Sequence, residues 1–315
     1  MLALLASGCG GGGGPSPAAT VLARPSPAQA PTAPSTPAPP PKPKPPPPPQ
    51  YPLLVPGALG SAKSQLVPVV LWQGQPAAKV ARPDPSVTLL SFDQQRVRLR
   101  LHAGTVDPGT SGWQFGPAIA GTEAKLAVAA INGGFRLNVG AGGFEASGRV
   151  AVPLQDGLGS IVTYSDGHTD IGSWHHGVPA PGQQVESVRQ NLQLLVDHGQ
   201  PASNADCQSC WGATLGGVDD PARAALGITS DGSLVWAAGE HLTVSHLAQA
   251  LVSAHVQRAV ELDINPEWVA GYVFAHNQHD GAPHAVPALP DQQGIPGQFL
   301  TPWVRDFFAF EARSS

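Results

Sequence analysis

Two acidic side chains lie two residues apart near the end of a strand-like stretch, RAVELDINPEW, at residues 258–268. Alternation of apolar and polar residues there places Glu261, Asp263 and Asn265 on one face of a β-strand, with Cα atoms of successive members about 6.6 Å apart. Cleavage of a glycosidic bond generally uses two carboxyl groups, one as acid and one as base or nucleophile. The stretch is therefore a candidate catalytic strand, and the alternative is the solvated polar face of an edge strand.

An Asn-Gly-Gly turn directly follows the apolar run KLAVAAI at residues 125–131, which suits a buried strand. The glycines allow positive φ angles and close approach of the backbone, which leaves the Asn132 amide at the strand end. Asn132 with the backbone of Gly133 and Gly134 is a candidate binding site for a sugar hydroxyl or a phosphate oxygen. The alternative is a purely structural turn, because Asn-Gly is also a common tight-hairpin signal.

Arg223 precedes the apolar segment at residues 224–229. A guanidinium presents a planar fork of donors that matches two phosphate oxygens. Since basic residues are scarce in this chain, Arg223 is the candidate phosphate ligand. The alternative is a surface salt bridge to Asp219 or Asp220.

Trp268, five residues after Asp263, is the candidate aromatic ring for stacking on a sugar, although packing explains most tryptophans without a ligand. The histidines at residues 276–284 match no established metal-ligand spacing. No metal and no cofactor is expected.

The elements that must position these residues are mostly strands. Strand-like segments occur at residues 87–92 and 96–102, which we expect to be neighbours, and hairpins are expected at 160–174 and 226–237. One helix is expected from Thr243, as N-cap, to about residue 256, directly before the candidate catalytic strand. The pattern predicts an α+β fold: a mixed, largely antiparallel sheet with few helices in a single domain at residues 57–315.

The N-terminal region has a different composition. The chain has 315 residues, a net charge of -5 and 12% charged residues, so a basic nucleic-acid-binding surface is not expected. LASGC at residues 5–9 resembles the lipobox of bacterial lipoproteins, which implies a signal peptide at 1–8 and a lipidated Cys9. The alternative is a truncated ordinary signal peptide. Residues 9–56 are rich in Pro and Gly. This composition predicts a disordered tether between a membrane and the domain at residues 57–315.

The two remaining cysteines form a C-x-x-C motif, Cys207 and Cys210, inside loop-like sequence. No second such motif exists to complete a zinc site, and a redox pair would need a strand before it and a helix after it. In an exported protein we expect a disulfide that closes a small loop.

Four motifs together resemble the phosphodiester glycosidase family: AAINGGF at residues 129–135, NLQLLVDHG at 191–199, ARAALGI at 222–228, and ELD at 261–263. The resemblance covers about residues 85 to 310. It implies an enzyme that hydrolyses a sugar-1-phosphodiester or related linkage in a cell-surface glycan, with Asp263 as the main carboxylate, Glu261 as its partner, and Arg223 on the phosphate.

One motif departs from the family pattern. Where the family typically carries Asn-Leu-Asp-Gly-Gly-Gly-Ser, this chain has ELDINPE at residues 261–267, so Asp263 is retained while the glycines and the serine are replaced. Pro266 lacks the N–H that a glycine-rich anion-binding turn would offer. The departure leaves two alternatives to an enzyme: a catalytically degenerate relative that binds cell-wall polysaccharide, and a structural spacer lipoprotein.

Overall fold

The computed structural model describes residues 11–14, 51–110, 112–295 and 297–314. Backbone contacts divide the chain into two units, Met1–Pro46 and Pro47–Ser315, and the helices and strands described below lie in the second. Cys9 and most of the expected tether lie outside the described residues, so lipidation stays a prediction. Within the described residues, no helix is long and apolar enough to cross a membrane.

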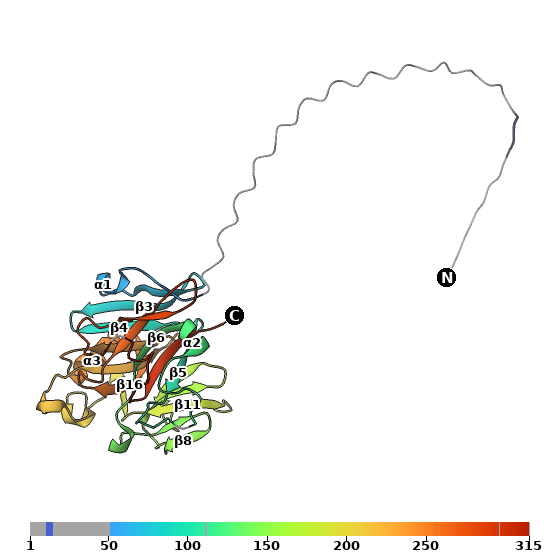
Figure 1. The fold of residues 1–315 in the computed structure, drawn as a ribbon. Coiled ribbons are helices and arrows are strands. Elements are labelled where there is room, and N and C mark those ends of the chain that lie inside the picture. Colours follow the sequence, from blue (N-terminus) through green and yellow to red (C-terminus); the bar gives the residue numbers. More distant parts are fainter. Residues whose placement is uncertain (1–10, 15–50, 111, 296, 315) are drawn as a thin grey trace, which may run out of the picture. The chain divides into compact units, whose positions relative to one another are not determined.

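The largest sheet has nine strands, and the segment that contains Glu261 and Asp263 is one of its interior strands (Figure 1). Its strands, in spatial order, are β1 (Leu53–Leu54), β2 (Val67–Trp72), β3 (Gln75–Asp84), β4 (Val87–Phe92), β15 (Leu234–Gly239), β14 (Arg223–Thr229), β16 (Val256–Ile264), β12 (Leu194–Asp197) and β13 (Gln200–Pro201).

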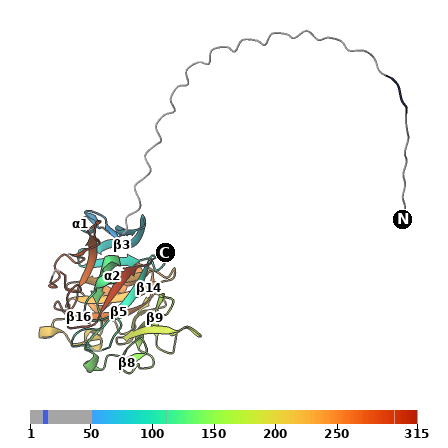
Figure 2. The same cartoon turned by 45° about the vertical axis from the view of Figure 1, so that its right-hand side comes forward.

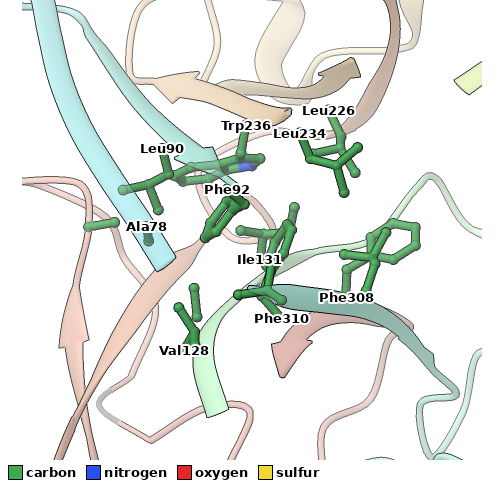
Figure 3. Packing of buried hydrophobic residues seen from close by; sticks show 14 of the residues in the cluster. Ala78, Leu90, Phe92, Val128, Ile131, Leu226, Leu234, Trp236, Phe308 and Phe310 are labelled. Carbon is green, nitrogen blue, oxygen red and sulfur yellow. The ribbon is translucent and has the colours of Figure 1, made fainter. Parts of the chain in front are cut away.

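A second sheet of five strands packs against the first and encloses the main core. Its strands, in order, are β18 (Pro283–Pro287), β17 (Gly271–His276), β6 (Ala127–Asn132), β19 (Phe307–Ala312) and β5 (Val97–His102). Phe92 of β4 and Phe310 of β19 stack across the interface with ring centroids 3.6 Å apart. Figure 3 shows this layer, with Ala78, Leu90, Phe92, Leu226, Leu234 and Trp236 from one sheet and Val128, Ile131, Phe308 and Phe310 from the other.

The third sheet lies at the opposite end of the unit from β3 (Figures 1 and 2). Its strands, in order, are β10 (Thr169–Ser173), β9 (Gly159–Tyr164), β11 (Val185–Gln190), β7 (Phe144–Ala146) and β8 (Arg149–Val152). The hairpins expected at residues 160–174 and 226–237 are confirmed as β9–β10 and β14–β15.

Helices are few, as the sequence predicts. The expected helix is confirmed as α3 (Val244–Ser253), with the Thr243 hydroxyl accepting the His246 N–H at 3.2 Å. The apolar face of α3 packs on the face of the nine-stranded sheet opposite the main core. Two short helices were not expected, α1 (Ala58–Ser61) and α2 (Gly121–Leu126). The predicted α+β class is confirmed, and each strand pair of the described sheets is antiparallel.

One expected pairing is wrong. β4 and β5, consecutive in the chain, lie in different sheets rather than side by side. Both strands have a buried apolar face, and the short turn between them carries the chain from one side of the main core to the other. Each sheet thereby contributes one apolar face to the same core.

Candidate functional site

The candidate catalytic strand, β16, is an interior strand. It pairs with β14 on one side and β12 on the other, and its residues from Ala259 to Ile264 are buried. The solvated edge strand considered from the sequence is therefore excluded. Arg223 on β14 pairs with Ile264 on β16, and Ala225 pairs with Glu261. Two residue steps on β14 therefore lie opposite three steps on β16. This β-bulge breaks the alternation between Glu261 and Asp263, and bulges commonly re-aim a side chain beside a functional site.

Glu261 does not share a site with Asp263, contrary to the prediction. Its carboxylate lies 2.7 Å from Nη1 of Arg223, and both side chains are 0% exposed. Burial raises the pKa of Glu261 to about 8, while Arg223 opposes the rise. Arg223 also donates from Nε to the Leu242 carbonyl and from Nη1 to the Trp211 carbonyl. The expected phosphate-binding role of Arg223 is therefore corrected to that of a buried partner of Glu261, since no substrate can reach it in this structure.

Asp263 lies where β16 leaves the nine-stranded sheet and meets the end of β6. Its backbone N–H donates to the Gly133 carbonyl at 2.8 Å. Its Oδ1 accepts the Ile264 N–H at 2.9 Å, and its Oδ2 lies 2.7 Å from Nη2 of Arg305. Burial raises the pKa of Asp263 to about 7, and Arg305 opposes this rise. Such a pKa suits a group that exchanges a proton near neutral pH.

The Asn-Gly-Gly turn is filled from inside the protein. The N–H groups of Gly133 and Gly134 donate to the carbonyl and to Oδ2 of Asp306, at 3.2 and 3.4 Å. Asp306 in turn is bound by Arg189, with Nε 2.7 Å from Oδ2. Both backbone amides therefore bind Asp306, one its carbonyl and the other its carboxylate, and their expected role toward a sugar or phosphate is corrected. Asn132 is buried beside them, and its Nδ2 donates to the Gly133 carbonyl at 3.2 Å.

A cavity of about 620 Å³ opens beside Asp263. Asp263, Arg305, Trp268 and Arg136 line one part of it. The guanidinium carbons of Arg305 and Arg136 lie 4.8 and 5.7 Å from the centre of the Trp268 ring, distances at which cations are attracted to an aromatic face. Trp268 thus lines the same cavity as Asp263, at a site rich in positive charge.

A second cavity, of about 420 Å³, shares Arg136, Trp268 and Arg305 with the first. Asp107 lines it, and Oδ2 of Asp107 lies 3.4 Å from Nε of Arg305. Arg305 therefore contacts the carboxylate of Asp263, which lines the larger cavity, and that of Asp107, which lines the smaller one. Asp263 and Asp107, rather than Glu261 and Asp263, are therefore the two acidic residues that line these cavities.

Asn265 supports the wall of the larger cavity. It has a φ of 77°, a left-handed conformation that Asn tolerates better than most residues. Its Oδ1 accepts the Leu215 N–H at 2.9 Å, and its Nδ2 donates to the Ala213 carbonyl at 3.4 Å. Asn265 lines the cavity as expected, but its amide holds the wall segment rather than being free for a substrate.

The disulfide expected from the sequence lies just before this wall. Cys207 and Cys210 are joined, and the short 3-10 helix Gln208–Trp211 contains the second cysteine. The Trp211 carbonyl, next along the chain, accepts from Arg223. The disulfide loop is thereby linked to the buried Arg223–Glu261 pair.

Sequence reasoning missed Arg305, Arg136 and Asp107, which lie in loops far apart in the chain. A signal for Arg305 was present, because the chain has only 17 Lys and Arg residues and Arg305 lies two residues before an aromatic strand. It also missed the buried acid Asp306 and Asn191, whose Nδ2 donates to the Glu261 carbonyl at 2.7 Å and whose Oδ1 accepts the Phe135 N–H at 3.0 Å. Asn191 therefore links the candidate catalytic strand to the Asn-Gly-Gly turn.

No protein-family model matches the sequence, and no curated protein matches it. Among solved structures, similarity is found to the zebrafish N-acetylglucosamine-1-phosphodiester alpha-N-acetylglucosaminidase catalytic domain auto-inhibited by its pro-peptide, with 13% identity, a TM-score of 0.46, and coverage of 80% of this chain and 81% of that one. A hypothetical protein from Synechocystis has 12% identity, a TM-score of 0.43, and coverage of 75% and 61%. A putative exported protein from Burkholderia pseudomallei has 14% identity, a TM-score of 0.41, and coverage of 75% and 75%. No assignment of function follows from similarities at this level.

Proposed function

We propose that this chain is an exported, membrane-tethered glycosidase that hydrolyses a sugar-1-phosphodiester or related linkage in a cell-surface glycan. The observation that carries the proposal is Asp263, a buried carboxyl that lines an accessible cavity 2.7 Å from Arg305. The motifs at residues 129–135 and 261–263 support the substrate class by their resemblance to the phosphodiester glycosidases.

Asp263 acts as the acid in this proposal. Because its pKa is raised to about 7, the carboxyl is protonated at lower pH and donates a hydrogen bond instead of repelling a phosphate. Arg305 and Arg136 then supply positive charge to the leaving phosphate, and a guanidinium fork suits phosphate oxygens. Among the described residues, Arg136 has no anionic partner of its own, which leaves its charge available.

Asp107 is the second carboxyl group. Water attacks the anomeric carbon while the bond from that carbon to the phosphate oxygen breaks. The water proton passes to Asp107, and the Asp263 proton passes to the departing phosphate monoester, so the products are a free sugar and that monoester. Arg305 contacts both carboxyl groups, which supports their action in one reaction.

The direct test measures sugar release from a panel of N-acetylglucosamine 1-phosphodiesters and aryl glycosides by the full chain. We expect turnover on at least one diester and a loss of about 100-fold or more in Asp263→Asn, the usual scale for removing a general acid. Absence of turnover on every substrate of the panel by the wild-type protein would contradict the proposal that this chain is an enzyme.

The alternative is a catalytically degenerate relative that binds cell-wall polysaccharide. The observation that favours it is the Asn-Gly-Gly turn, whose amides already bind Asp306. The same panel separates the two, because a binding protein retains the diester or glycan without releasing sugar, and Asp263→Asn leaves its affinity intact.

Membrane attachment through Cys9 belongs to the proposal as well. Mass spectrometry of the membrane fraction should find an N-terminus at Cys9 carrying a lipid. An unmodified N-terminus at Met1 would contradict the anchor without affecting the catalytic proposal.

A further inference from the structure

The two cavities beside Arg305 differ in chemistry, and the substrate must match both. Both cavities are lined by Arg136, Trp268 and Arg305, the shared residues that form their junction. A ligand that occupied both cavities would therefore lie against these two guanidinium groups. An anionic centre therefore belongs at the junction, and one group of the ligand extends to each side.

The larger cavity has mostly apolar side chains beyond the junction. Phe135, Ile264 and Leu192 line it, and Val139 and Leu215 are 61% and 58% exposed at its border. The amide of Asn265 is bound to the wall segment 213–215. Its charged side chains are Asp263 and the two shared arginines.

A sugar in this larger cavity would lose hydrogen bonds to water and find few side-chain partners to replace them. A buried hydroxyl without a partner costs about 1–3 kcal/mol. An apolar group in the same space gains about 25 cal/mol for each Å² removed from water. The larger cavity therefore favours a hydrocarbon group over a carbohydrate.

The smaller cavity has a larger share of polar side chains, although Val106, Trp268 and Val304 also line it. Asp107, Asn138, Arg136 and Arg305 line it and offer several donors and acceptors around 420 Å³. Asn138 is exposed, so its amide can bond with a sugar hydroxyl. This cavity suits the carbohydrate half of a ligand.

We propose that the substrate is an amphiphilic sugar phosphodiester, with its sugar in the smaller cavity, its phosphate at Arg136 and Arg305, and an apolar alcohol in the larger cavity. The proposal rests on the proposed function and narrows its substrate class. A diester between two sugars would fill the larger cavity poorly, whereas an alkyl or isoprenoid phosphodiester would fill both.

The first test measures binding of octyl phosphate and methyl phosphate to the full chain by calorimetry, below the micelle concentration of the octyl ester. These probes have no glycosidic bond, so the outcome is independent of turnover. We expect octyl phosphate to bind at least about tenfold more tightly, since each buried methylene is worth about 0.8 kcal/mol. Equal affinities would overturn the proposal.

A matched pair of variants tests whether the octyl group binds in the larger cavity. Val139→Ser with Leu215→Ser should reduce the ratio of octyl to methyl affinity several-fold, because both side chains border the larger cavity. Val150→Ser is the control: Val150 is 55% exposed in β8 and lines neither cavity. A ratio that stays unchanged in the double variant, or that falls equally in the control, would place the octyl group elsewhere and refute the assignment.

The sugar half is tested with N-acetylglucosamine 1-phosphate against methyl phosphate. Asn138→Ala should lower the ratio of these two affinities several-fold, and an unchanged ratio would contradict a sugar in the smaller cavity. If octyl preference is found while no diester is hydrolysed, the enzyme proposal fails and the amphiphile assignment stands. If diesters that release octyl phosphate and glucosyl phosphate are hydrolysed at equal rates, the enzyme proposal stands and the amphiphile assignment fails.

Discussion

Nη2 of Arg305 lies 2.7 Å from Oδ2 of Asp263, and both side chains are largely buried. This contact does not suffice to keep the acid ionised, because burial raises the pKa of Asp263 to about 7 in spite of the guanidinium. An acid that is half protonated near neutral pH beside a fixed positive charge is suited to assist the departure of a phosphate. The following predictions depend on this relationship and on the buried groups that surround it.

The rate of sugar release should fall as pH rises through 7. If Asp263 must be protonated, kcat/KM decreases about tenfold for each pH unit above about 7 and levels off below it. Asp263→Asn should lose this pH dependence together with most of the rate, as measured by initial rates from pH 5 to 9. Glu267→Gln is the control, because Glu267 is exposed and lines neither cavity. A pH limb that persists in Asp263→Asn would assign the titration to another group.

Asp263 should also make the protein less stable at higher pH. Its pKa is about 7 in the folded protein and 3.8 as the ordinary value, so the folded state binds the proton more tightly between these limits. The free energy of unfolding therefore falls as pH rises from about 4 to about 7, and this contribution is flat above 7. Relative to wild type, Asp263→Asn should gain stability over that window, on the order of 4 kcal/mol.

Urea unfolding of wild type and Asp263→Asn at several pH values measures this effect, since other titrations cancel in the difference. A difference in unfolding free energy that is independent of pH from 4 to 8 would be inconsistent with a raised pKa.

The Arg223–Glu261 pair should contribute to stability and not to substrate binding. At pH 9, above the pKa of about 8 of Glu261, removing one partner leaves a buried charge unpaired, so Arg223→Met or Glu261→Gln is expected to destabilise the fold by about 3–5 kcal/mol. The double variant Arg223→Met with Glu261→Leu should lose much less than the sum of the single losses. The exposed pair Arg96–Asp93 is the comparison, and Asp93→Asn should change stability by less than about 1 kcal/mol. Additive losses at residues 223 and 261 would argue against a coupled pair.

Gly133 should tolerate no side chain. A Cβ atom there would lie 2.3 Å from Oδ2 and 2.5 Å from the carbonyl oxygen of Asp306. Gly133→Ala must therefore displace the carboxylate that Arg189 binds, and we expect a loss of about 3 kcal/mol or more. Gly116→Ala is the matched control, because a Cβ there meets nothing within 4 Å. Thermal unfolding of both variants decides the matter; similar midpoints would mean that the Asn-Gly-Gly turn is not tightly enclosed.

Trp268 should act in substrate binding through its ring. Its contacts with Arg136 and Arg305 hold both cations at the junction of the two cavities. We expect Trp268→Ala to raise KM about tenfold or more with a smaller change in kcat, and Trp268→Phe to restore much of the loss, since a cation–π contact is worth about 1 kcal/mol or more. A fall in kcat alone, without rescue by Phe, would indicate a role other than positioning the two arginines.

Local patterns in the sequence predicted the elements around the site well. The 3.6-residue period and the Thr243 cap predicted α3, and alternation predicted β16 and the two hairpins. The pairing of strands was harder to predict, since β4 and β5 are close in sequence but belong to different sheets. Apolar patterning shows that a strand has a buried face, but it does not say which sheet provides the partner.

The sequence by itself determined that Asp263 lies at the end of a strand, near Trp268 and after a helix, because these features depend on neighbouring residues. Only the tertiary structure decided which groups meet Asp263. The bulge in β16 separates it from Glu261, the packing of two sheets brings Arg305 to it and Asp107 to Arg305, and Asp306 occupies the glycine turn. These outcomes depend on burial and on charges distant in the chain, which also set the pKa of Asp263, and no local pattern encodes them.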